Sequence, residues 1–109
     1  MMWGAGAARR IFAYTKPTDM RKSFLGLLAL VQQVFAEDPY SGHLFVFVNR
    51  RGSYVKILVW DRTGFALYAK RLERGRFVFP SALEQQELSE QTLRFLLDGI
   101  PLGGRHAMR

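Results

Sequence analysis

Apolar positions recur at helical spacing in the first third of the chain. The spaced residues are Met20, Phe24, Leu27, Leu28, Val31 and Phe35. Separations of three, four and seven residues place these side chains on one face of an amphipathic helix, where they pack into a core. Thr18 or Asp19 can cap the first free N–H groups, and the turn residues at 38–42 end the pattern. The sequence therefore predicts an N-terminal helix that begins near Thr18.

Alternating and continuous apolar runs then predict a sheet. The strand-like runs lie at residues 44–49, 54–61, 64–71 and, as a fourth strand, 76–80. Turn residues separate the strands at 49–53 and 73–75. Between the second and third strands, Asp61 and Gly64 are the residue types that a type I turn favours at its first and last positions. Because short loops join successive strands in antiparallel order, we expect an antiparallel meander.

A second, shorter helix is predicted near the C-terminus. Leu88 and Leu93 can form a hydrophobic staple around Ser89, which has the side chain of an N-cap residue. Gly99 followed by Pro101 ends this helix. The fold class that we expect is α+β. It is a single domain with an antiparallel β-meander of three to five strands, packed against the N-terminal amphipathic helix and the short C-terminal helix.

The remaining segments set the expected boundaries. Residues 10–15 alternate weakly and predict an edge strand, whereas residues 81–87 are polar and predict a loop. We expect a loose N-terminus at 1–9, one domain at 10–101 and a flexible tail at 102–109. A chain of 109 residues is long enough for one core and too short for a second lobe.

Composition narrows the class of protein further. The chain has no cysteine, which excludes disulfides, thiolate metal sites and a cysteine nucleophile. No apolar run approaches the roughly 20 residues of a membrane-spanning helix, so we expect a cytoplasmic protein that does not enter a membrane. The two histidines, His43 and His106, have no spaced partners, and the acidic residues do not form a convergent set. We therefore expect no enzyme activity, no catalytic residues, no metal and no cofactor.

Charge gives the strongest functional signal. The net charge is +7 and the isoelectric point is near 10.4, which favours polyanions as partners. The stretch from Arg50 to Arg76 holds eight basic residues against two acidic ones, whereas residues 77–98 carry a net charge of −3. The positive charge is thus concentrated in the predicted meander.

The order of the turns predicts where this charge collects. Chain direction reverses at each turn, so the turns at 49–53 and 72–75 lie at one end of the sheet and the Asp61–Gly64 turn lies at the other. Six basic side chains should therefore gather at the first end: Arg50, Arg51, Lys70, Arg71, Arg74 and Arg76. With Lys56 they form the candidate nucleic-acid or partner-binding set, because guanidinium groups hold phosphates through paired hydrogen bonds. Tyr54, Trp60 and Tyr68 could stack on bases if they are exposed.

Four segments also carry a resemblance to a known family. They are PTDMRKSF (17–24), DPYSGHLFVFVNRRG (38–52), VKILVWDRTGF (55–65) and KRLERGRFVFP (70–80). From about Arg10 to Ile100 the chain resembles the small accessory protein, called TnpB or Orf2-like, of bacterial insertion sequences of family sixty-six. Ser23 stands where that family has Gly, and Tyr68-Ala69 stands in place of a Trp-Tyr pair, which weakens a base-stacking role for that strand.

The resemblance implies a role in transposition of a bacterial mobile element. The implied protein is encoded beside a separate, larger transposase that carries the acidic catalytic triad, and it has no catalytic residues to carry over. We expect a non-catalytic accessory protein that binds DNA through the basic end of the sheet, with the transposase as partner and a homo-oligomer as a further option. The alternative is a protein-interaction module that binds or scaffolds the transposase without contacting DNA. RNA binding is a third option.

Overall fold

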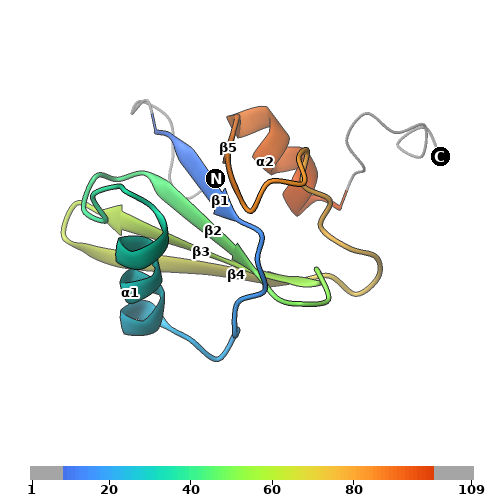
Figure 1. Ribbon diagram of the computed structural model, residues 1–109, viewed down its shortest axis with the longest axis horizontal. Coiled ribbons are helices and arrows are strands. Elements are labelled where there is room, and N and C mark those ends of the chain that lie inside the picture. Colours follow the sequence, from blue (N-terminus) through green and yellow to red (C-terminus); the bar gives the residue numbers. More distant parts are fainter. Residues whose placement is uncertain (1–8, 100–109) are drawn as a thin grey trace.

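A five-stranded sheet with two helices organises residues 9–99, the part of the chain that the computed structural model describes (Figure 1). In chain order the elements are β1 (Ile11–Tyr14), α1 (Phe24–Val34), β2 (Leu44–Val48), β3 (Tyr54–Asp61), β4 (Gly64–Arg71), β5 (Gln85–Leu88) and α2 (Glu90–Leu97). Across the sheet the strands are ordered β4-β3-β2-β1-β5. The described chain is thus one domain with a single sheet.

The sheet is mostly antiparallel but mixed. Strands β2, β3 and β4 form the predicted antiparallel meander, in which Trp60 pairs with Phe65 next to the second turn. The prediction of an edge strand near residues 10–15 was wrong in its position. Strand β1 lies inside the sheet, parallel to β2 with Ile11 opposite Leu44, and antiparallel to β5 on its other side. A parallel neighbour requires a crossover connection, and α1 provides it.

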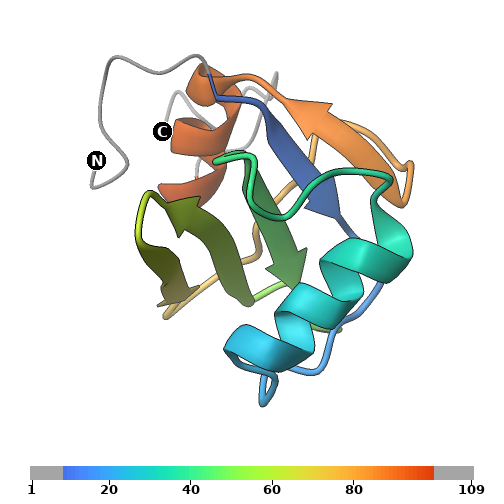
Figure 2. The ribbon, with the colours of Figure 1, turned by 90° about the vertical axis from the view of Figure 1, so that its left-hand side faces the viewer.

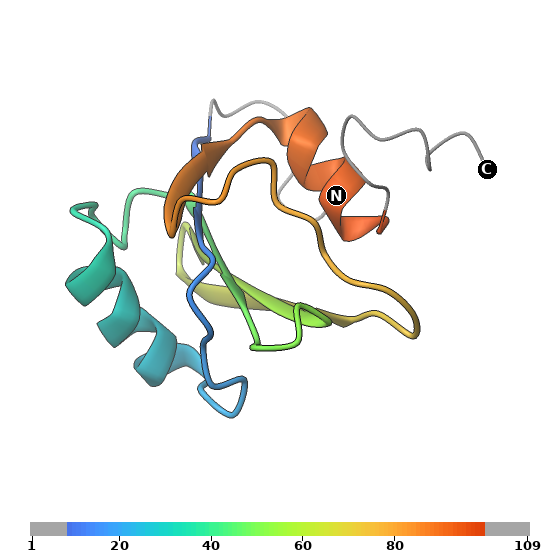
Figure 3. The same cartoon turned by 45° about the vertical axis from the view of Figure 1, so that its right-hand side comes forward.

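Each face of the sheet is covered by one helix (Figure 3). Strand β2 shows why both faces can be apolar. Its Phe45 and Phe47 side chains pack towards α1, while Leu44, Val46 and Val48 pack towards α2. From α1 the buried side chains are Leu27 and Val31, and from α2 they are Leu93, Leu96 and Leu97. We call the two sides of the sheet the α1 face and the α2 face.

The predicted start of the first helix was wrong by several residues. Helix α1 begins at Phe24 after Ser23, whose side chain makes no capping hydrogen bond. Asp19 instead stabilises a separate turn, in which its Oδ1 accepts from the Arg21 N–H at 2.9 Å. Thr18 is buried, and its N–H donates to the Val48 carbonyl at 2.9 Å. The residues expected to open the helix therefore attach the preceding loop to the end of β2.

Two strand predictions near the C-terminus were also wrong. Residues 76–80 are not a strand, although Phe77 is buried and Val78 is exposed as in an alternating strand. This segment belongs to the connection that leads from β4 at one edge of the sheet to β5 at the other. Residues 81–87, predicted as a loop, contribute most of β5 instead. In β5 only Leu88 is buried, and the other three residues are polar, so the sequence shows no alternation of apolar and polar residues that would predict a strand.

The turn and capping predictions had mixed outcomes. Ser89 is the N-cap of α2, because its Oγ accepts from the Thr92 N–H at 3.0 Å. Leu88 and Leu93 are buried in the same core cluster, as a hydrophobic staple requires. The type I turn predicted at Asp61–Gly64 was wrong, because φ of Arg62 is +57° and type I turns need about −60° there.

The expected ends of the chain are only partly described. Gly99 has φ of +73° after the last turn of α2, which is the conformation that glycine favours at the C-terminal end of a helix. Three of the expectations fall outside the described residues: the helix stop at Pro101, the flexible tail at 102–109, and the loose N-terminus at 1–9 except for residue 9.

Candidate functional site

The β2–β3 turn and the segment after β4 meet at one end of the sheet. Within the turn, the Asn49 Oδ1 accepts from the N–H groups of Ser53 (2.9 Å) and Tyr54 (3.1 Å). Gly52 has φ of +72°, a left-handed conformation that few other residues adopt without strain. The Gly52 carbonyl accepts from the Phe77 N–H at 2.7 Å, and the Ser53 carbonyl accepts from the Leu72 N–H at 2.8 Å. Backbone hydrogen bonds therefore join the two basic segments.

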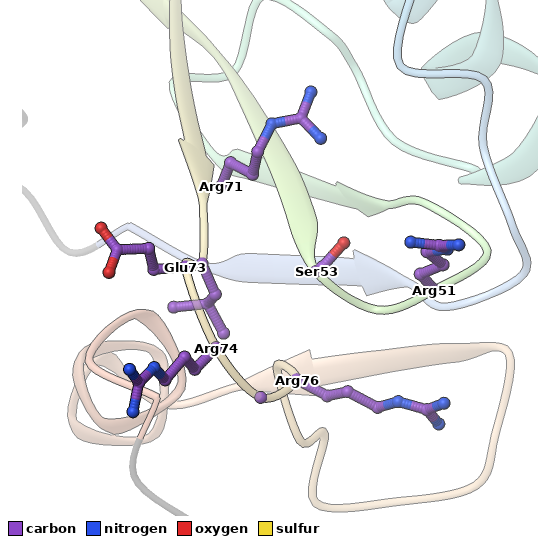
Figure 4. Close-up of a pocket in the computed structure, with 8 residues that line it drawn as sticks. Arg51, Ser53, Arg71, Glu73, Arg74 and Arg76 are labelled. Carbon is purple, nitrogen blue, oxygen red and sulfur yellow. The ribbon is translucent and has the colours of Figure 1, made fainter.

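A cavity of about 440 Å³ lies at this junction, and arginines dominate its lining (Figure 4). The polar residues that border it are Arg51, Ser53, Arg71, Glu73, Arg74 and Arg76. We call it the arginine cavity. It confirms, for four of the six basic side chains, the prediction that they gather at one end of the sheet. Figure 4 shows that the four guanidinium groups project in different directions from the backbone around the cavity.

The charge of the arginine cavity is not neutralised by contacting carboxylates. Among residues 9–99 the ion pairs are Arg10–Glu87, Arg21–Asp19 and Arg94–Glu90. Glu73 borders the cavity but forms none of these pairs. Four arginines against one carboxylate leave a local surplus of positive charge that an anionic ligand can compensate.

A second cavity, of about 490 Å³, lies beside the first on the α1 face. It is bordered by Asp19, Met20, Arg21, Asn49, Tyr54 and Arg71. We call it the tyrosine cavity. Arg71 borders both cavities, and its guanidinium carbon lies 4.3 Å from the centre of the Tyr54 ring. Tyr54 and Arg71 are direct partners in the pairing of β3 with β4, which explains this contact.

The Asp19–Arg21 pair borders the tyrosine cavity and has a strong effect on the carboxylate. Arg21 donates from Nε to Oδ1 at 3.0 Å and from a terminal nitrogen to Oδ2 at 2.7 Å. These hydrogen bonds, with the one from the Arg21 backbone N–H, lower the pKa of Asp19 from 3.8 to about 2. Asp19 is therefore ionised at neutral pH and orients Arg21.

The other predicted basic residues do not border the arginine cavity. Arg50 is exposed in the same turn as Arg51 but does not border the arginine cavity. Lys56 lies on the α1 face, where its Nζ donates to the Lys22 carbonyl at 2.8 Å. Lys70 lies on the α2 face, where its Nζ donates to the carbonyl of Leu97, the last residue of α2, at 2.6 Å. Binding of nucleic acid by these three residues stays a prediction.

The predicted stacking residues border neither cavity. Trp60 is half-buried near the Asp61–Gly64 turn, at the opposite end of β3, where its ring contacts Tyr40 and Phe65. Tyr68 is half-buried and packs against the core on the α2 face. Base stacking by Trp60 and Tyr68 therefore stays a prediction without support from their placement. Tyr54 is the aromatic residue that lies beside the arginines.

Sequence reasoning missed the contribution of Met20 and Arg21 to this end of the molecule. Both were assigned to the first helix or its start, whereas they border the tyrosine cavity. The hydrogen bond between the Thr18 N–H and the Val48 carbonyl brings their loop beside Asn49. This contact is long-range, so spacing along the chain could not reveal it.

Residues that were considered for catalysis have structural partners. His43 Nδ1 accepts from the Arg10 N–H at 3.0 Å, while Glu87 and Glu90 form ion pairs with arginines. Within residues 9–99, no group of three or more histidine, aspartate or glutamate side chains is placed to hold a metal ion. His106 lies outside the described residues. Neither helix of the described chain has the length and apolar character needed to cross a membrane.

The fold and the site define a small basic domain of two helices on a mixed, mostly antiparallel sheet, with an arginine-lined surface at one end of the sheet. Comparison with known sequences identifies its family. The chain belongs to the IS66 Orf2-like proteins, whose family profile matches residues 9–107. It is therefore an accessory protein associated with a bacterial insertion sequence, as the resemblance predicted.

Two relatives come from Sinorhizobium fredii (strain NBRC 101917 / NGR234). "Uncharacterized protein y4hO" is 43% identical over 100 residues, which span 91% of this chain and 87% of that protein. "Uncharacterized protein y4jC" is 40% identical over 100 residues, which span 91% of this chain and 86% of that protein. No solved structure matches the chain.

Proposed function

We propose that this accessory protein takes part in transposition by binding DNA at the arginine cavity, without catalysing a reaction itself. The observation that carries the proposal is the set of four arginines around one cavity, none of which forms an ion pair within residues 9–99. Guanidinium groups bind phosphate oxygens through charge-assisted hydrogen bonds, and contacts of this kind supply most non-specific affinity for DNA.

The directions of the arginines favour a long anion over a small one. In Figure 4 the guanidinium groups of Arg71, Arg74 and Arg76 point away from one another. A single phosphate could contact one or two of them, whereas successive phosphates of a nucleic-acid backbone could contact several. The turn that carries Arg51 is fixed to the segment that carries Arg74 and Arg76 by backbone hydrogen bonds, so their spacing is set before binding.

The salt dependence of DNA binding tests this proposal. Fluorescence anisotropy with a labelled duplex from the end of the element would give dissociation constants between about 50 and 200 mM salt. We expect log-linear weakening with salt. The double variant Arg74→Ala, Arg76→Ala should bind more weakly and flatten the slope by about 0.9 for each phosphate contact that is lost.

Arg94→Ala is the matched control for this experiment. Like the single variant Arg74→Ala, it removes one positive charge, but Arg94 lies on α2 and forms an ion pair with Glu90 at 2.8 Å. We expect it to leave the slope unchanged. The proposal would be rejected if the wild-type protein bound no DNA at low salt, or if Arg94→Ala weakened binding as much as a single cavity substitution.

A second candidate function is an interaction module for the transposase, and helix α1 favours it. The helix contains no charged residue. Leu25, on its outer side, is 82% exposed, and Phe24, its first residue, was expected in the core but is 44% exposed. Figure 2 shows α1 in front of the sheet, away from the covered α2 face. Exposed apolar side chains that lie next to each other at the start of a helix are typical of protein–protein contacts. Copurification of the transposase without DNA would support this function.

A further inference from the structure

The two cavities at the basic end share Arg71 but differ in chemistry. The arginine cavity holds a surplus of three positive charges, from four arginines and one glutamate. The tyrosine cavity holds Arg21 and Arg71 against Asp19, together with the side chains of Met20 and Tyr54. The arginine cavity therefore suits phosphates, and the tyrosine cavity suits a flat, partly apolar group. Because Arg71 borders both cavities, the two cavities adjoin each other at this residue.

Tyr54 and Arg71 lie in contact at the border of the tyrosine cavity. The guanidinium carbon of Arg71 lies 4.3 Å from the centre of the Tyr54 ring, which is the distance of a cation–π contact. Unpaired bases stack on aromatic rings and on guanidinium planes. A cavity of about 490 Å³ is within the size range of sites that hold small organic groups.

The position of this pair is fixed by the fold. Tyr54 is the first residue of β3, and its N–H donates to the Asn49 side chain at 3.1 Å. Arg71 is its partner on β4, the edge strand of the sheet. Lys56 lies on the same face, with its Nζ 5.9 Å from the centre of the Tyr54 ring. The Tyr54 ring thus has two positive neighbours, Lys56 on the same strand and Arg71 on the adjacent strand.

We propose that this end of the sheet binds single-stranded DNA, with backbone phosphates in the arginine cavity and one unpaired base on the Tyr54–Arg71 pair in the tyrosine cavity. The inference rests on the proposed DNA-binding function and adds a preference for an unpaired strand. In duplex DNA the bases stay stacked on their neighbours. A duplex can therefore use the arginine cavity but cannot place a base in the tyrosine cavity.

The test compares a thymidine homopolymer of about 15 nucleotides with a duplex of the same length, both labelled for anisotropy at low salt. We expect the single strand to bind wild-type protein more tightly than the duplex. Tyr54→Ala should weaken single-strand binding about tenfold, or about 1.4 kcal/mol, and duplex binding less than about twofold. Tyr54→Phe, which keeps the ring, should bind both ligands as the wild type does.

Tyr40→Ala is the matched control, because Tyr40 is an exposed tyrosine that contacts Trp60 and Phe65 at the other end of the sheet. It should change neither affinity. If Tyr54→Ala proves unfolded by circular dichroism, Tyr54→Leu takes its place, since it keeps apolar packing without the ring.

Two results would overturn the preference for a single strand. One is equal binding of single strand and duplex by the wild type, and the other is an equal effect of the Tyr54 substitutions on both ligands. In either case the Arg74→Ala, Arg76→Ala variant would still lose affinity, so DNA binding itself would stand. If the wild type binds neither ligand at low salt, both proposals fail.

Discussion

At the scale of single residues, Asp19 and Arg21 show how two neighbours can build an oriented pair on an exposed loop. Four hydrogen bonds from the Arg21 main chain and guanidinium, between 2.7 and 3.1 Å long, reach the Asp19 carboxylate. They favour the ionised form and lower the pKa of Asp19 to about 2. The pair holds Arg21 beside the tyrosine cavity, where it can meet a ligand.

This pair predicts a specific pH dependence. Because the pKa of Asp19 is lower in the folded protein than its ordinary value of 3.8, the pair stabilises the folded state fully above that value. Its contribution is lost as the pH falls from about 4 to about 2. Carboxyl chemical shifts measured by NMR should show Asp19 titrating near 2 in the wild type and at a higher pH in Arg21→Gln, which loses the guanidinium bonds but keeps the one from the backbone N–H.

Arg94→Gln serves as the control, because Arg94 pairs with Glu90 on α2 and should leave the titration of Asp19 unchanged. A wild-type Asp19 that titrates near 3.8 would contradict the prediction. The unfolding free energies of the wild type and Asp19→Asn, compared at pH 6 and below pH 2, should differ at the higher pH and converge at the lower one.

The role of Asp19 also marks the limit of residue-level prediction. Its side chain was expected to cap a helix, and it does accept a backbone N–H two residues later. The preference of aspartate for such bonds is the same in turns and at helix starts. Residues 18–22 form a loop that is held by contacts with distant parts of the chain, from the Thr18 N–H to the Val48 carbonyl and from Lys56 Nζ to the Lys22 carbonyl.

At the scale of elements, hydrophobic alternation predicted which side chains are buried better than it predicted which segments pair as strands. Phe77 and Phe79 pack on the core and Val78 is exposed, as the pattern at 76–80 indicated, yet the segment makes no ladder. Conversely, β5 pairs with β1 although most of its residues are polar. The three strands of the meander were predicted well because short turns fix their partners. The partners of β1 and β5 are distant in sequence, and no local pattern specifies them.

Lys70 links two elements and gives a prediction about α2. Its Nζ donates to the Leu97 carbonyl at 2.6 Å, where the last carbonyls of a helix lack partners and attract positive charge. Lys70→Met keeps the aliphatic chain but removes this bond. We expect the free energy of unfolding, measured by urea denaturation, to fall by about 1 to 2 kcal/mol.

Arg74→Met is the matched comparison, because Arg74 is exposed and makes no side-chain hydrogen bond or ion pair within residues 9–99. It should alter stability by less than about 0.5 kcal/mol and should weaken DNA binding. The assignment of Lys70 to the end of α2 would be wrong if Lys70→Met unfolded like the wild type and weakened DNA binding as much as Arg74→Met.

At the scale of the whole molecule, the turn order of the meander was enough to predict a basic end. Reversals at 49–53 and 72–75 bring Arg51, Arg74 and Arg76 together whatever the other strands do. The tyrosine cavity could not be predicted in this way. It requires the loop before α1, and the βαβ crossover from β1 to β2 determines where that loop lies. Local turns thus position the charges, while long-range topology positions the groups beside them.

The arginine cavity and the outer side of α1 are formed by different elements. The arginine cavity lies at the ends of β3 and β4, whereas Leu25 projects from the outer side of the helix, where it is 82% exposed. A protein with two such surfaces can hold DNA on one and the transposase on the other. The proposed function and the second candidate function are therefore compatible in one molecule.

Two variants should separate these surfaces. Leu25→Gln removes exposed apolar area without changing the net charge, so we expect it to reduce capture of the transposase in a pull-down and to leave DNA affinity unchanged. Arg74→Ala with Arg76→Ala should do the reverse, because it removes phosphate contacts and leaves α1 intact. If both variants lose both partners, the transposase and DNA share one surface at the basic end. If Leu25→Gln leaves capture of the transposase unchanged, Leu25 does not contribute to the contact, and the second candidate function loses its main support.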